Sequence, residues 1–453
     1  MQANQRVLAS RRNQLADSVA SHARRARLLL SKTLKTGDPC PQAPESGECR
    51  PKQTRNAEIG GQIMHCLAEE DLVTLRDDVF DIPKARPGGS LHDFLEAIFA
   101  DYCEKIRAFK EPLACILESR IDRIKTLCDA LVDAYRLGTA QDLSKAYSRM
   151  EAGLSGIHDE LLAMSHRNSA RVAPGQSWYR LAAWRATRHE QMFHMPFGRV
   201  QKSYRFSVAG VPGVPAIYLA NSVYLCWLEC GQPKDYDKCL VSRFEIDSSG
   251  FAFLDLPCSH RAYVDPLDDP KIPGFEWDPR RVTNSPYLVD VQKELAEYLT
   301  VWPLLATVSI RKLAEGPNPP EYVVPQLLMR WVAHQEKFLG VRYFTSKDDP
   351  STNSNDWSIN LALPARTTRD AGYCEFLAKR TRFTPPQRLS AMNGKTLESL
   401  VTKESGDRRQ AEAGRYMLRW PDGRVEPYFQ TVFGKMEYWL DRPEIQLARV
   451  QNV

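Results

Sequence analysis

Between Tyr204 and Cys230 the sequence combines an arginine, a turn rich in glycine and proline, and a glutamate that ends an apolar segment. Arg205 lies at the start of this stretch and Glu229 lies close to its end. A carboxylate in apolar surroundings needs a partner, and Arg205 is the candidate. A guanidinium group binds phosphate through its planar fork, and a carboxylate stabilises positive charge that develops beside it. The two residues could therefore act together on a phosphate-bearing substrate.

Four predicted elements must bring these two side chains together. Residues 204–207 read as a strand-like run, and residues 210–215 predict a turn because glycine and proline dominate them. Ala216–Leu219 is apolar and predicts a short strand. Asn221 or Ser222 can then cap a helix through its side-chain oxygen. Glu229 falls on the last turn of that helix.

The whole stretch resembles the RES domain, a family named for its arginine, glutamate and serine. Longer members of the family share the order found here, in which the arginine and the turn are followed by segments like Ala216–Ser222 and Cys226–Glu229. The resemblance covers residues from Trp178 to Pro364. RES proteins are bacterial toxins that consume NAD+, and their fold is related to that of ADP-ribosyltransferases. The resemblance therefore implies an α+β body with a central mixed or antiparallel sheet.

The resemblance also assigns roles to individual residues. Arg180 and Arg205 would bind the pyrophosphate of NAD+, and Tyr218 would stack on the nicotinamide ring. Breaking the nicotinamide–ribose bond develops positive charge on the ribose. Glu229 would either stabilise this charge or orient the ribose hydroxyls. Ser346 would hold a ribose or the attacking acceptor by a hydrogen bond. NAD+ is thus expected as a substrate, and no metal is expected.

Each assignment has an ordinary structural alternative. Arg180 could be a surface arginine in the strand that Trp178–Leu181 predicts, and Tyr218 could be a core aromatic residue. Ser346 follows the predicted strand Val341–Phe344 and would be one of many loop serines without its flanking pattern.

The second arginine role has a competitor. Arg199 lies only six positions before Arg205 in the sequence. Arg205 is favoured because Ser207 and Gly210 follow it in the family order. Compact family members carry Gly-Arg-Trp-Asn where this chain has residues 204–207, so this assignment departs most from the family pattern. His194 could reach the same site, but a packed loop histidine is expected.

Composition narrows the class of protein. The chain has 453 residues, 43% of them hydrophobic, which predicts two or three domains. A net charge of +5 is too small to indicate nucleic acid as a partner. The 11 cysteines are scattered without a Cys-x-x-Cys pair, which favours reduced thiols and argues against zinc. No signal peptide and no run of about 18 apolar residues is found, so a cytoplasmic protein away from the membrane is expected.

Four regions are predicted along the chain. Residues 1–60 form a basic, poorly ordered arm and linker, although an arm that resembles a transit peptide or touches anionic surfaces is an alternative. Residues 61–170 form a helical domain, which either docks a partner such as an antitoxin or packs on the catalytic body. Residues 175–365 form the RES-like catalytic domain, and residues 366–453 form a C-terminal extension with a hairpin around the turn 421–423.

The coarse secondary structure follows from apolar spacing and from the turn residues. Gly138 is expected to end the second helix, and Pro325 is expected to turn a strand into a helix. Residues 259–287 form a long insertion or lid. The predicted elements are helices over 94–106, 113–138, 143–162 and 291–298, and strands over 239–246, 251–256, 321–324, 341–344 and 357–364.

Three functions remain open from the sequence. The first is an NAD+-degrading enzyme that passes the ADP-ribosyl group to water or phosphate, as a toxin or in phage defence. The second is an ADP-ribosyltransferase that modifies a macromolecule, since only the acceptor differs. The third is a non-catalytic binding protein on a degenerate RES body. No glycine-rich phosphate loop is found, which disfavours hydride transfer and ATP hydrolysis.

Overall fold

The described residues all belong to one compact unit, Ile63–Val453, and the division of the chain into four regions stays a prediction. The basic arm predicted over residues 1–60 and most of the predicted lid lie outside the described residues. The structure is a computed structural model, and it describes residues 67–171, 177–182, 189–200, 204–208, 214–257, 285–313, 319–345, 359–367, 369–396, 399–400, 417–420 and 422–450.

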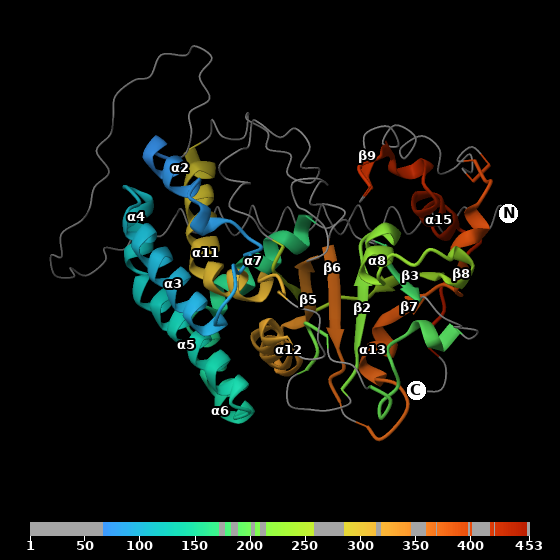
Figure 1. The fold of residues 1–453 in the computed structure, drawn as a ribbon, viewed down its shortest axis with the longest axis horizontal. Helices are drawn as coiled ribbons and strands as arrows, with labels where there is room; N and C mark the ends of the chain where they lie inside the picture. The colour runs from blue at the N-terminus through green and yellow to red at the C-terminus, as the bar shows by residue number, and fades with distance from the viewer. Residues whose placement is uncertain are drawn as a thin grey trace, which may run out of the picture. The chain divides into compact units, whose positions relative to one another are not determined.

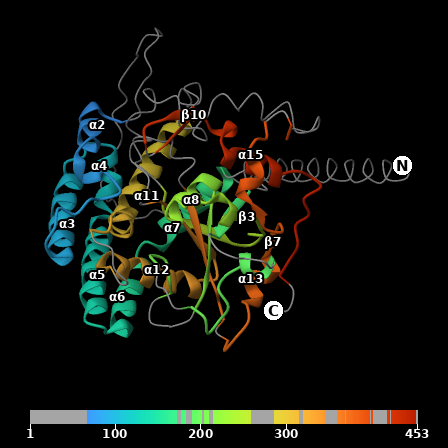
Figure 2. The same ribbon diagram turned by 45° about the vertical axis from the view of Figure 1, so that its right-hand side comes forward.

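The part of the chain before the first strand is helical, as predicted, and its helices gather at one end of this unit, except the last of them, which lies beside the sheet (Figures 1 and 2). Their apolar faces share one hydrophobic core with α11 (Ser285–Ser309) and α12 (Val323–His334). This packing supports the alternative in which the helices cover the body of the protein. The helices are α2 (Glu69–Leu75), α3 (Leu91–Arg107), α4 (Leu113–Glu118), α5 (Ile121–Thr139), α6 (Leu143–Ser155) and α7 (His158–Arg171).

Two details of these helices differ from the prediction. The segment after Pro112 forms two helices, α4 and α5, because the chain breaks at residues 119–120. Gly138 lies inside α5 and does not end it. A side chain at this position would meet Val323 Cγ1 at 2.5 Å, so the glycine allows α5 and α12 to approach closely. The chain instead turns at Gln141, whose φ of 64° is left-handed.

The central sheet is mixed, which confirms the α+β class. Its strand order is β4-β5-β6-β2-β1-β3-β7, and β8 also pairs with β3. Only β4 and β5 among these described strands run parallel. The strands are β1 (Trp178–Ala182), β2 (Ala216–Ala220), β3 (Leu240–Ile246), β4 (Ala252–Asp255), β5 (Phe338–Phe344), β6 (Ile359–Pro364), β7 (Thr381–Phe383) and β8 (Gln387–Arg388).

The sheet has a seam between β1 and β2. Five residue pairs join β2 to β6 and five join β1 to β3, but only Tyr179 and Ala220 pair across β1 and β2. One face of the sheet is correspondingly covered by two separate cores. Ala216 and Ala362 belong to the core of α11 and α12, whereas Tyr179 and Ala220 pack with α8 (Val223–Glu229) and α15 (Val432–Leu440). The seam therefore separates two packed regions.

Three predicted elements differ from the structure in their type or their length. Residues 204–207 form a turn, in which the Ser207 amide donates to the Tyr204 carbonyl at 3.1 Å. The strand predicted over residues 321–324 is a short 3-10 turn, η4 (Pro320–Tyr322), followed by α12. The helix predicted over residues 291–298 extends through Pro303 to form α11, whose buried residues are apolar on several sides. Proline is tolerated there because neighbouring packing holds the helix.

Gly340 gives a testable packing prediction. It lies inside β5, where an added Cβ would meet the Ala362 carbonyl oxygen and Leu363 Cδ2 of β6. We expect Gly340→Ala to lower the free energy of unfolding by about 1–3 kcal/mol in urea titration, because the strands must move apart. The control is Gly156→Ala, where the nearest atom is the Gly153 carbonyl oxygen at 3.4 Å. Equal stability of the two variants would contradict this packing.

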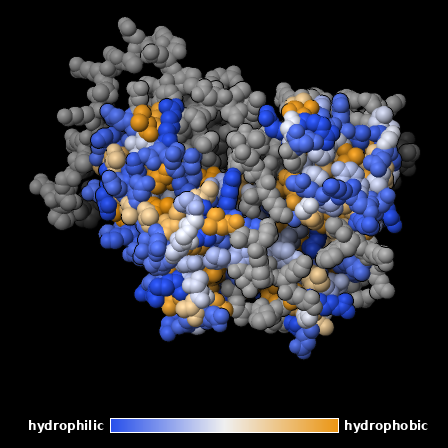
Figure 3. Space-filling model, viewed as in Figure 1, coloured by the Kyte–Doolittle hydropathy of each residue, from blue (hydrophilic) through white to orange (hydrophobic). Residues whose placement is uncertain are grey.

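The C-terminal region completes the sheet and supports α8. It contributes β7, β8 and α13 (Glu375–Arg380), and the predicted hairpin is confirmed as β9 (Met417–Arg419) and β10 (Val425–Pro427). Most of the described surface in Figure 3 is hydrophilic, with hydrophobic residues in small groups. Among the described helices, none combines the length and the apolar character that crossing a membrane would require.

Candidate functional site

Helix α8 is held firmly at its N-terminus. Ser222 caps it, as predicted, because its Oγ accepts a hydrogen bond from the Leu225 amide at 3.2 Å. Glu437 of α15 accepts a second bond from the Val223 amide at 2.7 Å. An acidic group at a helix N-terminus also complements the helix dipole. These contacts fix the direction in which α8 presents Glu229 at its other end.

Glu229 is exposed, but its carboxylate is held by two buried donors. Its Oε1 accepts hydrogen bonds from Thr345 Oγ1 at 2.7 Å and from Asn360 Nδ2 at 2.8 Å. Thr345 and Asn360 are each 3% exposed. The sequence predicted a buried glutamate with Arg205 as its candidate partner. In the structure Glu229 is exposed, and it accepts hydrogen bonds from Thr345 and Asn360. An exposed carboxylate with a fixed orientation can act on a ligand that arrives from solvent.

Arg205 lies close enough to interact with Glu229 electrostatically. Burial lowers the pKa of Arg205, and Tyr322, Tyr343 and Glu229 act in the opposite direction. Its Nη1 donates to the Val308 carbonyl at 3.0 Å, and its guanidinium lies 5.1 Å from the ring centroid of Tyr322. Val308 belongs to the last turn of α11, whose carbonyls lack helical partners.

Arg205 therefore has a structural role but retains capacity to bind a ligand. Its Nη2 is buried and has no hydrogen-bond partner among the described residues. A buried guanidinium nitrogen without a partner is costly. An anionic ligand would remove that cost by accepting a hydrogen bond from Nη2.

Tyr218 supports the turn that carries Arg205. Its hydroxyl donates to the Phe206 carbonyl at 3.2 Å, and its ring centroid lies 5.1 Å from that of Tyr204. Burial raises the pKa of Tyr218 well above its ordinary value, so the hydroxyl stays protonated at neutral pH. These contacts fit the alternative in which Tyr218 is a core aromatic residue. Stacking of Tyr218 on the nicotinamide ring stays a prediction.

Arg180 lies at the seam of the sheet. Its neighbour Tyr179 shares a face with Ala220, so Arg180 belongs to the opposite face from Tyr218. Burial lowers the pKa of Arg180, and Cys230, Tyr204 and Tyr218 partly offset this effect across the seam. Its Nη1 is buried and has no hydrogen-bond partner within the part of the chain that the structure describes. The register assigns Arg180 and Tyr218 to opposite faces of their strands, but the electrostatic interactions of Arg180 with Cys230, Tyr204 and Tyr218 place its guanidinium near the residues around Tyr218.

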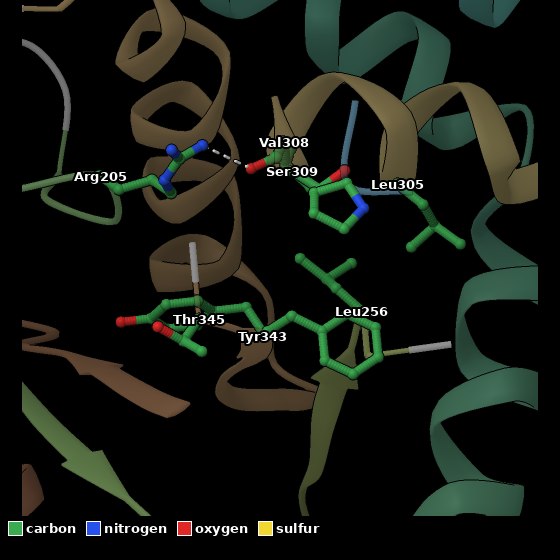
Figure 4. Close-up of a pocket in the computed structure, with 9 residues that line it drawn as sticks. Arg205, Leu256, Leu305, Val308, Ser309, Tyr343 and Thr345 are labelled. Atoms are coloured by element: carbon green, nitrogen blue, oxygen red, sulfur yellow. Dashed lines mark hydrogen bonds between the residues drawn. The ribbon is translucent and has the colours of Figure 1, made fainter. Parts of the chain in front are cut away.

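A small pocket lies between Arg205 and the end of β5 (Figure 4). Arg205 faces the Val308 carbonyl across its upper part, with Tyr343 and Thr345 below. Leu256 and Leu305 form the apolar side. The cavity volume is about 20 Å³, which accommodates about one water molecule. Ser346, the predicted family serine, lies outside the described residues, immediately after Thr345.

His194 is a packed residue, as expected, and it gives a pH prediction. Burial and the nearby Arg180 lower its pKa to about 4, although its bond to the Met195 carbonyl acts in the opposite direction. Its Nε2 accepts a hydrogen bond from the Cys374 amide at 2.8 Å, which requires a neutral ring. The unfolded chain therefore binds a proton between pH 6.5 and 4 that the folded chain does not, so folding stability falls as pH falls through this window.

We expect the stability gap between wild type and His194→Gln to narrow by about 3 kcal/mol between pH 7 and pH 4. Urea titrations of both proteins at several pH values measure this gap. A variant without the imidazole lacks this titration, so other acid-sensitive groups cancel in the comparison. A constant gap would show that folding does not change the pKa of His194.

Sequence reasoning missed three residues of the site. These residues are Asn360, Tyr343 and Thr345. Asn360 of β6 pairs with Tyr343 of β5 on one side and with Ala220 of β2 on the other, and Thr345 directly follows β5. A usable signal existed for Asn360. It interrupts a strand that is otherwise apolar at nearly every position, and a buried amide in such a strand needs a polar partner.

One relative is similar to most of the chain. The chain is 28% identical over 378 residues to a protein described as "Putative toxin YopC" from Bacillus subtilis strain 168, covering 81% of this chain and 79% of the relative. No protein-family model matches the chain. No solved structure matches it either. The RES resemblance and the relation to ADP-ribosyltransferases therefore remain predictions.

Proposed function

We propose that this protein is a toxin that cleaves the nicotinamide–ribose bond of NAD+, on a body related to the RES domain. The observation that carries the proposal is the proximity of two groups of opposite charge. One is the fixed, exposed carboxylate of Glu229. The other is Arg205, whose buried Nη2 has no hydrogen-bond partner in the described parts of the chain. The name of the Bacillus relative supports the toxin class independently.

The proposed reaction uses few protein groups. Arg205 binds an oxygen of the pyrophosphate, and Glu229 lies beside the ribose of the nicotinamide half. The bond between ribose C1′ and the nicotinamide nitrogen breaks, and its electron pair leaves with neutral nicotinamide. Glu229 stabilises the positive charge that develops on the ribose. An oxygen of water or phosphate then bonds to C1′, and the acceptor releases its proton to solvent.

Binding requires that the site open. A cavity of about 20 Å³ is far smaller than a dinucleotide, and Arg205 is held by Val308. A phosphate oxygen is a stronger acceptor for guanidinium than a backbone carbonyl, because charge-assisted hydrogen bonds are stronger. NAD+ would therefore displace the Val308 carbonyl from Arg205 and separate the turn from α11.

A toxin of this class would need control inside the cell that makes it. A protein partner such as an antitoxin could supply this control by docking on the helical region, residues 61–170, which is one of the two roles that the sequence left open for it. The exposed Glu229 favours a second candidate acceptor, because a macromolecule could also reach it from solvent. In that case the ADP-ribosyl group would be transferred to a protein or nucleic acid.

Controlled expression in bacterial cells tests the proposal. We expect cell growth to stop and the free NAD+ concentration to fall within minutes of induction, without isotope from adenine-labelled NAD+ appearing on macromolecules. Labelled protein or nucleic acid would instead favour the transferase. Growth arrest with unchanged NAD+ and no label would refute both reactions.

A further inference from the structure

Glu229 lies at the end of a helix, where a long side chain ordinarily has several orientations. Its carboxylate nevertheless has one defined position, because Thr345 and Asn360 both donate to Oε1. The two donors come from β5 and β6, which are neighbouring strands of the sheet. Helix α8 and the sheet are therefore connected directly at the candidate site.

Asn360 is itself immobilised. It pairs in register with Tyr343 on one side and with Ala220 on the other, in the middle of the sheet. The preceding amide, that of Ile359, donates to Asn221 Oδ1 at 3.2 Å, and Asn221 directly precedes the cap of α8. The strand that carries the donor and the helix that carries the acceptor are thus joined at both ends of α8.

We propose that Asn360, assisted by Thr345, is a positioning residue that holds the Glu229 carboxylate in the orientation needed for the reaction. The inference rests on the proposed function. Asn360 donates through an uncharged amide, so it orders the carboxylate without neutralising it. An arginine or lysine in its place would offset the negative charge that stabilises the ribose in the transition state. A buried uncharged donor is the chemistry that suits this task.

The first test removes the donor while keeping the side-chain size. We expect Asn360→Leu to lower kcat for NAD+ cleavage by about 10- to 100-fold, the equivalent of one hydrogen bond to a charged group, with KM little changed. Thr345→Val should have a similar but smaller effect. The control is Asn393→Leu, an exposed asparagine that follows the short helix Leu389–Met392, and we expect it to leave kcat unchanged.

The second test restores a donor only at low pH. In Asn360→Asp two carboxyl groups lie at hydrogen-bond distance and share one proton, so the protonated group donates to Glu229. We expect the activity of this variant relative to wild type to be highest near pH 5 and to fall at least tenfold by pH 8. Arg205 and Tyr343 also act electrostatically on this region and are unchanged in both proteins. A role confined to stability would not create this pH dependence.

Crystal structures of wild type and Asn360→Leu give a readout that needs no turnover. We expect the Glu229 carboxylate to occupy one position in wild type and to leave Thr345 in the variant. The wild-type protein could fail to cleave NAD+ while the carboxylate still moves in Asn360→Leu. That result would refute the proposed reaction and retain the positioning role. Unchanged kcat, or an unmoved carboxylate in Asn360→Leu, would overturn the role of Asn360.

Discussion

Replacing Glu229 with glutamine is expected to lower kcat for NAD+ cleavage by about 10²- to 10³-fold, because a preoriented group that stabilises transition-state charge contributes about that factor. Glutamine keeps the size of the side chain and can still accept bonds from Thr345 and Asn360 through its amide oxygen. Only the negative charge is lost. Steady-state assays of nicotinamide release by the purified variant measure the effect.

The fold should survive this substitution because Glu229 is exposed. Glu336→Gln is the matched control, since Glu336 is also exposed but lies beyond α12, away from the turn that carries Arg205. We expect the control to cleave NAD+ at the wild-type rate. A folded Glu229→Gln protein with wild-type turnover would refute the role of Glu229.

Replacing Arg342 with methionine is expected to lower the free energy of unfolding by about 3–5 kcal/mol, because a buried charge would lose its partner. Arg342 Nη1 donates to Asp255 Oδ2 at 3.0 Å, and the two side chains are 7% and 3% exposed. This pair joins β4 to β5, the parallel strands of the sheet. Thermal and urea unfolding measure the loss.

Two controls separate the buried charge from a general effect of losing an arginine. Adding Asp255→Leu to Arg342→Met should recover much of the stability, because both charges are then gone. Arg382→Met breaks the pair with Glu245, in which the arginine side chain is 56% exposed, and should cost at most about 1 kcal/mol. A loss in Arg342→Met no larger than that in Arg382→Met would show that the Asp255 charge is not effectively buried.

Local apolar patterns predicted much of the fold. The strands near Leu240–Ile246 and Ala252–Asp255, and the helix capped by Ser222, each follow from residues that are close in the sequence. Pairings across the sheet could not be predicted in this way. The contacts Asn360–Glu229 and Arg205–Val308 join residues more than 100 positions apart, as their separations of 131 and 103 show.

The same limit explains the errors around Arg205. Its segment looks like a strand because Tyr204 and Phe206 alternate with polar residues. In the structure the Tyr204 amide donates to Ser207 Oγ at 2.8 Å, and this local bond competes with strand pairing. Gly138 was expected to end a helix. Its actual role is close packing between elements, which depends on tertiary structure.

The most direct test of the account is product analysis with the pure protein. NAD+ is incubated with the wild-type protein in water and in phosphate buffer, and proton NMR follows nicotinamide and the ribose C1′ proton. We predict one equivalent of free nicotinamide for each NAD+ consumed, together with ADP-ribose or its 1″-phosphate. NAD+ that remains intact, or that breaks at the pyrophosphate without releasing nicotinamide, would contradict the central claim.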